Sequence, residues 1–235
     1  MNTQRTLIIV PAFNEEATIE DVVTDIVGAG YDYVVVNDGS KDATLAICKE
    51  RGFNVIDLPV NLGLAGAFQT GMMYAWRNNY DYAVQFDADK QHRAEYLDAL
   101  VAEMADNDIV IGSRFVTEPK PHTARMIGSR LIAFAIKLTT GKTIKDPTSG
   151  MRCFNRRMME LFAFSINISP EPDTLAYLIR SAGARIKEVQ VTVDERSAGK
   201  SYLTAANSVR YMVRIMLSVL LIQFFRTKLT SKGKA

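Results

Sequence analysis

The sequence has few of the features that mark disulfide-rich, zinc-binding or nucleic-acid-binding proteins. Its 235 residues include two cysteines, Cys48 and Cys153, which lie far apart and without CxxC spacing. This pattern favours reduced thiols in a cytosolic protein over a disulfide framework or a zinc site. The net charge of +2 is too small for a surface that tracks a nucleic-acid backbone. We therefore expect no nucleic-acid partner.

Long hydrophobic runs are also absent. The first apolar run, residues 7–10, is too short for a signal peptide, so we expect no export by that route. Residues 215–225 are apolar apart from Ser218 and Gln223. This run is shorter than the roughly 20 residues that a membrane-spanning helix needs. It suits the surface of a membrane better than its interior.

A composition of 48% hydrophobic and 23% charged residues predicts a folded chain with a real core, without internal repeats or low-complexity linkers. Short β-type apolar runs alternate with helix-like segments. This alternation predicts an α/β fold with a parallel sheet covered on both faces. The expected strands are residues 7–10, 33–36, 53–58, 82–86 and 109–111.

Polar segments follow several expected strands, at the sheet edge where α/β proteins bind ligands. The first strand is followed by Pro11-Ala12-Phe13-Asn14-Glu15 instead of GxGxxG, which argues against a dinucleotide-binding fold of the NAD type. A glycine-containing segment, residues 61–66, comes only after the third strand. By itself it is more typical of a helix-entry turn than of a ligand loop.

The stretch Asp87-Ala88-Asp89 after the fourth strand carries the strongest chemical signal. On an extended backbone, Asp87 and Asp89 would point to one side and Ala88 to the other. Two converging carboxylates can hold Mg²⁺ or Mn²⁺ and leave coordination positions for the oxygens of a diphosphate. Alone, the motif would more often be a solvated acidic turn.

Six segments, taken together and in order, resemble the family 2 glycosyltransferases of GT-A fold, and most closely those of the polyprenyl-phosphate sugar synthase type, similar to dolichol-phosphate mannose synthase. The resemblance covers roughly residues 5–205. It implies a GT-A, Rossmann-like, mainly parallel sheet with helices on both faces. The segments are 10–16, 36–42, 61–63, 87–92, 112–115 and 146–152.

The resemblance also implies site residues. Asp87, Asp89 and Gln91 would carry Mg²⁺ or Mn²⁺, and Gln91 would add a neutral oxygen ligand. The residues that would bind the nucleotide sugar are Pro11, Phe13, Glu15, Asp38, Asp87 and Ala88. Two alternatives stay open: Asp38 as a helix cap or turn residue, and His92 as an orienting neighbour of the metal motif or a satisfied surface residue.

Residues 114–157, the basic stretch, hold ten basic and two acidic residues. This excess predicts a local anion site, for which Arg114, Arg125 and Arg152 are candidate phosphate clamps. By resemblance, the acceptor phosphate would contact Arg114, Arg125, Ser129, Arg196 and Lys200. The chain departs from the family in having Tyr202 where a lysine is common, and whether Lys200 replaces that lysine is open.

The expected reaction is inverting transfer of a sugar from a UDP- or GDP-sugar to a polyprenyl phosphate, with Asp89, Arg114 and Arg125 as the catalytic residues. A phosphate monoester carries a nucleophilic oxygen at neutral pH, so no base is required. Asp146 is expected to order its loop rather than to act as a base. The alternatives are a family 2 transferase acting on a saccharide hydroxyl, and a non-catalytic sugar-nucleotide-binding subunit.

We expect two parts: a glycosyltransferase domain at 1–205 and a C-terminal amphipathic helix with a basic tail at 206–235. In the helix, Arg210, Arg214 and Ser218 form one polar stripe on an otherwise apolar surface. The helix would lie on a membrane or pack on a partner, either a second copy or a small membrane protein. The expected location is the cytoplasmic face of the membrane, with peripheral attachment.

Overall fold

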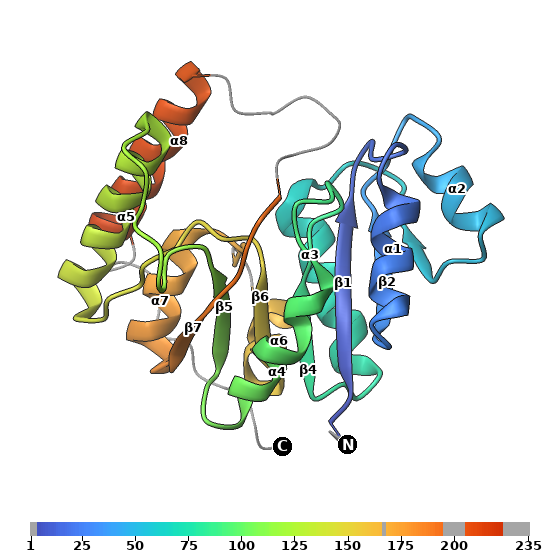
Figure 1. Cartoon of the computed structure of the whole chain (residues 1–235), viewed down its shortest axis with the longest axis horizontal. Helices are drawn as coiled ribbons and strands as arrows, with labels where there is room; N and C mark the ends of the chain where they lie inside the picture. Colours follow the sequence, from blue (N-terminus) through green and yellow to red (C-terminus); the bar gives the residue numbers. More distant parts are fainter. Residues whose placement is uncertain (1–3, 166–167, 195–204, 223–235) are drawn as a thin grey trace.

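The structure is a computed structural model that describes residues 4–165, 168–194 and 205–222. A single 7-stranded sheet, in the order β3-β2-β1-β4-β6-β5-β7, has helices on both faces (Figure 1). The strands are β1 (Thr6–Ala12), β2 (Asp32–Asn37), β3 (Val55–Asp57), β4 (Tyr82–Gln85), β5 (Ile109–Ser113), β6 (Arg152–Asn155) and β7 (Ile186–Gln190).

The helices cover the sheet in two layers. Helices α1, α2 and α4 pack on one face, and α3, α5, α6, α7 and α8 contribute to the core on the other face. Their bounds are α1 (Ile19–Gly28), α2 (Thr44–Glu50), α3 (Gly63–Arg77), α4 (Leu97–Ala102), α5 (Ala124–Thr140), α6 (Arg156–Phe164), α7 (Pro172–Ala182) and α8 (Ala205–Leu217), with 3₁₀ turns at Ala94–Tyr96 and Glu103–Ala105 and a π-helical turn at Ser218–Ile222.

The strand β1 shows why the sheet is sandwiched. Its side chains alternate between the two cores, Leu7 and Ile9 on one face and Ile8 and Val10 on the other, and all four are fully buried. A strand buried on both faces must be apolar at every position, which is the continuous apolar pattern in the sequence. The predicted fold class and all five predicted strands are confirmed.

Two strands lie outside the predicted set. Strand β6 pairs antiparallel with both β4 and β5, and β7 pairs parallel with β5. The sheet is therefore mixed, with one reversed strand near its centre. Strand β6 has four residues and begins with the charged Arg152, so it lacks the apolar run that identified the other strands.

Helix α8 packs beside α5 and belongs to the same core as the sheet (Figure 1). Ile215 of α8 and Val219 of the π-helical turn after it are buried in that core. The polar stripe faces the beginning of α7: Arg214 pairs with Glu171, and Ser218 Oγ donates to Asp173 Oδ2 at 2.6 Å. In the described part of the chain, no helix has the length and hydropathy that would let it cross a bilayer.

Candidate active site

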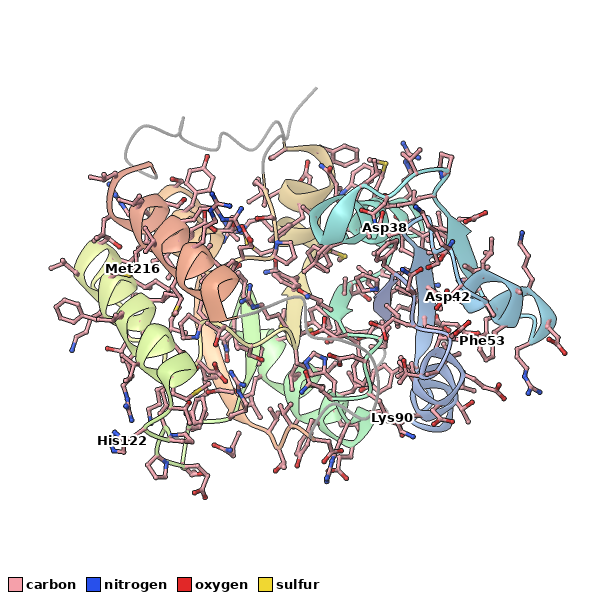
Figure 2. The ribbon with its side chains drawn as sticks, turned by 90° about the horizontal axis from the view of Figure 1, so that it is seen from above. Asp38, Asp42, Phe53, Lys90, His122 and Met216 are labelled. Carbon is pink, nitrogen blue, oxygen red and sulfur yellow. The ribbon has the colours of Figure 1, made fainter. Side chains whose placement is uncertain are left out.

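A cavity of about 420 Å³ lies at the carboxyl ends of β1, β2 and β4, where parallel sheets bind ligands. It brings together the six residues predicted to bind a nucleotide sugar, and Asp89. The lining residues are Pro11, Ala12, Phe13, Glu15, Asp38, Asn61, Gly63, Leu64, Ala67, Asp87, Ala88 and Asp89. Figure 2 shows Asp38 and Lys90 on one side of the molecule, with His122 and Met216 on the opposite side.

The loop after β1 is held in place by the loop that leads into α2. The Asn14 N–H donates to Ser40 Oγ at 3.0 Å, and Asn14 Oδ1 accepts from the Lys41 N–H at 2.8 Å. The Glu15 N–H donates to Thr44 Oγ1 at 2.8 Å. These bonds hold the backbone around Phe13 and Glu15, which forms one wall of the cavity.

Asp38 holds the turn that leads into α3 and also lines the cavity, while its role in binding a nucleotide sugar stays a prediction. It lines the cavity, and its Oδ1 accepts from the Leu62 N–H at 2.7 Å, just before the first residue of α3. The next residue, Gly39, has φ 65°, and a Cβ there would lie 2.8 Å from the Asn61 nitrogen. Only glycine lets these two loops approach so closely.

The acidic motif is a turn and not an extended segment. Strand β4 ends at Gln85, and Ala88 and Asp89 lie in a turn beyond it. All three residues line the cavity, and Ala88 is also buried in the core that includes α1 and α4, so the expectation that its side chain turns away from the two carboxylates stays a prediction. The motif therefore presents a small residue between two carboxylates.

His92 orients the acidic motif from behind. It is 7% exposed, and its Nδ1 accepts from the Asp87 N–H at 3.0 Å. Gln85 Nε2 donates to Asp87 Oδ1 at 3.3 Å. Of the two alternatives for His92, this geometry fits the orienting neighbour.

Two hard carboxylates, on Asp87 and Asp89, suit a divalent cation whose other ligands come from a diphosphate and water. The residues described contain no group of three or more His, Cys, Asp or Glu that could hold an ion alone. Gln91 is not among the lining residues, and its Nε2 donates to the Asp194 carbonyl at 3.2 Å. Its role as a ligand stays a prediction.

Asp146 is paired with Arg114. Its carboxylate, which is fully buried, accepts from Arg114 Nε at 2.7 Å and Nη2 at 2.8 Å. Burial by itself would raise the pKa of Asp146, but the hydrogen bonds and charge of Arg114 outweigh it and hold the pKa below its ordinary value. This pairing fits the loop-ordering interpretation of Asp146. A carboxylate in such a pair has no open side for a substrate hydroxyl.

Arg152 is a structural residue, and its interpretation as a phosphate clamp is wrong. Its side chain is 2% exposed, and its guanidinium donates to the carbonyls of Ser149, Pro147 and Pro170 at 2.9, 2.8 and 3.1 Å. Burial lowers the pKa of Arg152 to about 10. With its donors used on three carbonyls, it holds the loop and cannot reach a ligand.

The loop that Arg114 and Arg152 hold touches the acidic motif. A Cβ on Gly150 would lie 2.4 Å from Asp87 Oδ2, so the loop and the carboxylate are in direct contact. Through this contact the cavity borders the loop of residues 146–150, which lies within the basic stretch.

The residues predicted for the acceptor phosphate are only partly described. Ser129 is 2% exposed, and its Oγ accepts from Lys120 Nζ at 2.8 Å and lies 3.4 Å from Thr148 Oγ1. The backbone of Arg125 lies in the first turn of α5, but its side chain, like Arg196, Lys200 and Tyr202, lies outside the described part. Sequence reasoning had counted Lys120 only as one charge of the basic stretch.

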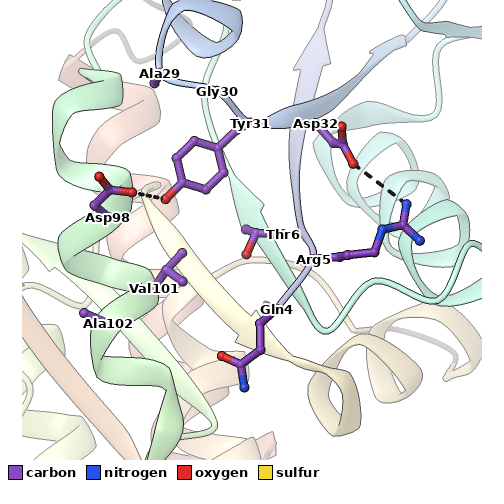
Figure 3. A pocket seen from close by; sticks show the side chains of 10 residues that line it. All are labelled: Gln4, Arg5, Thr6, Ala29, Gly30, Tyr31, Asp32, Asp98, Val101 and Ala102. Atoms are coloured by element: carbon purple, nitrogen blue, oxygen red, sulfur yellow. Dashed lines mark hydrogen bonds and ion pairs between the residues drawn. The ribbon is translucent and has the colours of Figure 1, made fainter. Parts of the chain in front are cut away.

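A larger cavity, of about 560 Å³, lies at the opposite end of the sheet, beside the beginnings of β1 and β2 (Figure 3). The Tyr31 hydroxyl donates to Asp98 across it, and Arg5 and Asp32 are 3.8 Å apart at its rim. Burial raises the pKa of Tyr31. None of the predicted site residues lines this cavity, and it lies at the end of the sheet where α/β proteins do not bind substrates.

Comparisons with known proteins found relatives similar over most of the chain. Polyprenol monophosphomannose synthase of Mycolicibacterium smegmatis is 29% identical over 91% of this chain and 86% of its own length. A UDP-N-acetylglucosamine–dolichyl-phosphate N-acetylglucosaminyltransferase of Methanococcus voltae is 30% identical over 66% of this chain and 71% of its own length.

A solved structure has the same fold. Glucosyl-3-phosphoglycerate synthase of Mycobacterium tuberculosis, crystallised with Mn²⁺, UDP and glucosyl-3-phosphoglycerate, superposes with a TM-score of 0.67 at 19% identity, covering 94% of this chain and 80% of that chain. The family model of glycosyl transferase family 2 matches residues 7–162, more than half of the chain. The protein therefore belongs to glycosyltransferase family 2.

Proposed function

We propose that the protein transfers a sugar, with inversion, from a nucleoside diphosphate sugar to a polyprenyl phosphate. The observation that carries this proposal is the contact of Gly150 with Asp87, because it sets the loop that Arg114 and Arg152 hold against the carboxylates of the donor cavity. A lipid-phosphate acceptor also agrees with the activities after which the two relatives are named. Their different sugars leave this protein's sugar and nucleobase open.

The donor cavity suits a nucleotide diphosphate. Its volume of about 420 Å³ lies in the range of roughly 300–1,000 Å³ of small-molecule sites. In this assignment Pro11, Phe13, Glu15 and Asp38 surround the nucleoside, while Asp87 and Asp89 face the diphosphate. A Mg²⁺ or Mn²⁺ ion held by these two carboxylates would neutralise charge on the departing nucleoside diphosphate. The ordered loops supply orientation, which is a large part of catalysis when two anions must meet.

A phosphate acceptor removes the need for a general base. Its second pKa is near 6, so an anionic oxygen is available at neutral pH. This agrees with the burial of Asp146 against Arg114, which leaves that carboxylate unsuited to take a proton from a hydroxyl. The residues around the acceptor would then only align it and screen the repulsion between two phosphates.

Membrane attachment is part of the proposal. Helices α5 and α8 lie side by side (Figure 1), and each exposes a stripe of large apolar residues with helical spacing. Such exposed faces favour a lipid surface or a partner, and an exposed basic residue on α5, Lys137, favours anionic headgroups. The stripes are Ile127, Leu131, Phe134 and Leu138 on α5, and Val213 and Leu217 on α8 with Leu221 in the π-helical turn that follows it. We assign the protein to the cytoplasmic face as a peripheral protein.

The test is transfer to lipid. Vesicles that contain undecaprenyl phosphate are incubated with the protein, Mn²⁺ and a panel of labelled UDP- and GDP-sugars, and lipid-linked label is measured. We expect one sugar to be transferred, and EDTA to abolish the transfer. Label appearing only on added saccharides, or release of free nucleotide without any transfer, would overturn the proposed acceptor.

A further inference from the structure

The turn after β4 that carries Asp89 has a strained backbone. Of the non-glycine residues that the structure describes, Asn14, Asn79 and Lys90 have positive φ, and the φ of Lys90 is 63°. Asparagine tolerates this left-handed conformation, whereas lysine rarely adopts it. A strained turn keeps its shape only where its neighbours hold it. The contacts of residues 89–93, the motif turn, therefore decide how the Asp89 carboxylate is presented.

Helix α1 holds one side of the motif turn. Lys90 Nζ pairs with Asp21 of this helix. The Ala94 N–H, just after the motif turn, donates to Asp25 Oδ2 at 3.0 Å. The side chains of Lys90 and Asp21 are both exposed, and exposed ion pairs contribute little. These contacts alone are a weak support for a strained turn.

Asp194 holds the other side with all of its polar groups. Its N–H donates to the Gln91 carbonyl at 3.0 Å, and its own carbonyl accepts from Gln91 Nε2 at 3.2 Å. One carboxylate oxygen of Asp194 accepts from Arg93 Nε at 2.8 Å, and the other accepts from Arg93 Nη2. Such a two-point pair fixes direction as well as distance. Arg93 Nη1 also lies 3.4 Å from Glu95 Oε1, a second and longer contact.

The segment that brings Asp194 to the motif turn is itself anchored. Strands β6 and β5 lie between β4, which leads to the motif turn, and β7, which leads to Asp194. After β7, Val191 is buried and Val193 packs against the core that includes α1 and α4. The chain therefore runs from the edge of the sheet to the motif turn over a packed core, and it offers Asp194 as a fixed support.

The geometry of the Arg93–Asp194 pair favours a role in positioning over a role in stability. Both side chains are 43% exposed, and ion pairs at such exposure change the free energy of unfolding very little. Within the motif turn, however, the Gln91 N–H donates to Asp89 Oδ1 at 3.2 Å. A displacement of Gln91 would therefore be passed directly to the Asp89 carboxylate.

We propose that Arg93 and Asp194 are positioning residues, which hold the motif turn so that Asp89 presents its carboxylate to the divalent cation of the donor. This inference rests on the proposed function, because it needs a cation between the acidic motif and a diphosphate. Both residues lie outside the six segments that carry the family resemblance, and neither lines the donor cavity. They act through Gln91 and Asp89 and do not touch the ligand.

The first experiment is a double-mutant cycle of Arg93→Met, Asp194→Ala and the variant that carries both. Binding of Mn²⁺ in the presence of UDP is measured from the electron paramagnetic resonance signal of the free ion. Each single variant should weaken Mn²⁺ binding about tenfold, which is typical of losing a partner that orients a metal ligand. The double variant should weaken it by about the same factor, because the two residues act through one contact. Melting temperatures should stay within about 4 °C of the wild type.

The matched control is Arg51→Met, which breaks the exposed pair of Arg51 with Glu20 of α1 at 2.9 Å. It should leave Mn²⁺ binding within about twofold of the wild type. Mn²⁺ affinities of Arg93→Met and Asp194→Ala that equal the control would overturn the proposal. A lower melting temperature with unchanged Mn²⁺ binding would also overturn it, as would additive effects in the double variant.

A second experiment uses the wild-type protein, so that it does not depend on the folding of a variant. Hydrogen exchange of single amides is followed by NMR with and without UDP and Mn²⁺. The Asp194 N–H donates to the Gln91 carbonyl, so ligands that stabilise the motif turn should slow its exchange. The control is the Ala184 N–H, which donates to the Leu178 carbonyl at the end of α7 and should be unaffected. Equal exchange of the Asp194 N–H in both states would contradict the proposal.

These readouts separate the positioning pair from the proposed reaction. If Arg93→Met and Asp194→Ala weaken Mn²⁺ binding but no sugar reaches lipid in the wild type, the positioning role holds and the proposed reaction fails. If sugar reaches lipid and both variants bind Mn²⁺ as the wild type does, the reaction holds and the positioning role is wrong.

Discussion

At the scale of single residues, the site is built by contacts between loops that are distant in the sequence. The Asp87 N–H donates to His92 Nδ1, and the Asp87 carboxylate accepts from Gln85 Nε2. Gly150 of a distant loop packs against the same carboxylate. The residue types of the acidic motif were readable from the sequence. The position of Gly150 was not, because a contact between residues so far apart in the chain is decided only when the sheet forms.

The acidic motif leads to the first prediction. Asp89→Asn should lower turnover by about a hundredfold or more, because it removes a charge aimed at the departing diphosphate. Asp87→Asn should be nearly as severe. Activity is measured over a range of Mn²⁺ concentrations, with melting temperature as the folding control. Full activity of either variant in EDTA-treated buffer would contradict the assignment of the metal.

The second prediction concerns Gly150. Gly150→Ala should lower activity by about tenfold or more while leaving the fold intact, because the added methyl group would lie 2.4 Å from Asp87 Oδ2 and must displace it. The matched control is Gly28→Ala, where nothing lies within 4 Å of the added carbon. Equal kinetics of the two variants would show that Asp87 tolerates displacement.

The third prediction follows from the buried pair of Asp146 and Arg114. Asp146→Asn should lower the free energy of unfolding at pH 7 by about 3 kcal/mol or more, because it leaves a charged guanidinium without its partner. The exposed Asp106→Asn is the control. Stability is measured by urea unfolding.

The pH dependence of this effect has a definite sign. The folded-state pKa of Asp146 is below the ordinary value of 3.8, so the pair stabilises fully above about pH 4 and its contribution is lost as the pH falls through the folded pKa. The difference between wild type and Asp146→Asn should therefore shrink in acid. A difference that does not change with pH would contradict this account.

At the scale of elements, the side chains of helix α8 and the turn after it meet three environments: polar groups near α7, the core, and the molecular surface. The polar stripe of α8 and the π-helical turn after it meets Glu171 and Asp173 of the α7 region. Ile215 of α8 and Val219 of the turn enter the core, and Leu217 stays exposed. The sequence indicated the helix and its wide apolar surface. It could not indicate which apolar residues are buried, because that depends on where α5 and α7 lie.

The exposed stripes of α5 and α8 lead to the fourth prediction. Phe134→Gln with Leu138→Gln should lower binding to anionic vesicles by about tenfold or more, because each side chain would lose apolar contact with lipid. Stability should hardly change, since the two side chains are 63% and 67% exposed. Val27→Gln, on α1 and 53% exposed, is the control. If the double variant and the control bind vesicles equally, the stripe on α5 is not a membrane surface.

At the scale of the whole molecule, the sequence predicts a catalytic domain with an appended helix, whereas in the structure this helix shares one core with the sheet. A chain ending at residue 204 would lose Ile215 and Val219, which are buried against the same core as the sheet. We expect this fifth variant to melt at a lower temperature or to aggregate, because the faces of α5 and α7 would be exposed. A cooperative transition at the wild-type temperature would instead support the independent helix expected from the sequence.

The sequence by itself determined the class of sheet, its five main strands and the residue types of the donor cavity. These follow from local patterns, since a strand buried on both faces must be apolar throughout and polar residues gather where parallel strands end. Tertiary structure alone decided the reversed strand β6, the burial of Arg152 and the pairing of Arg114 with Asp146. Charge counted along the chain does not say which cations meet carboxylates or carbonyls, because those partners come from distant segments and are chosen only when the layers pack.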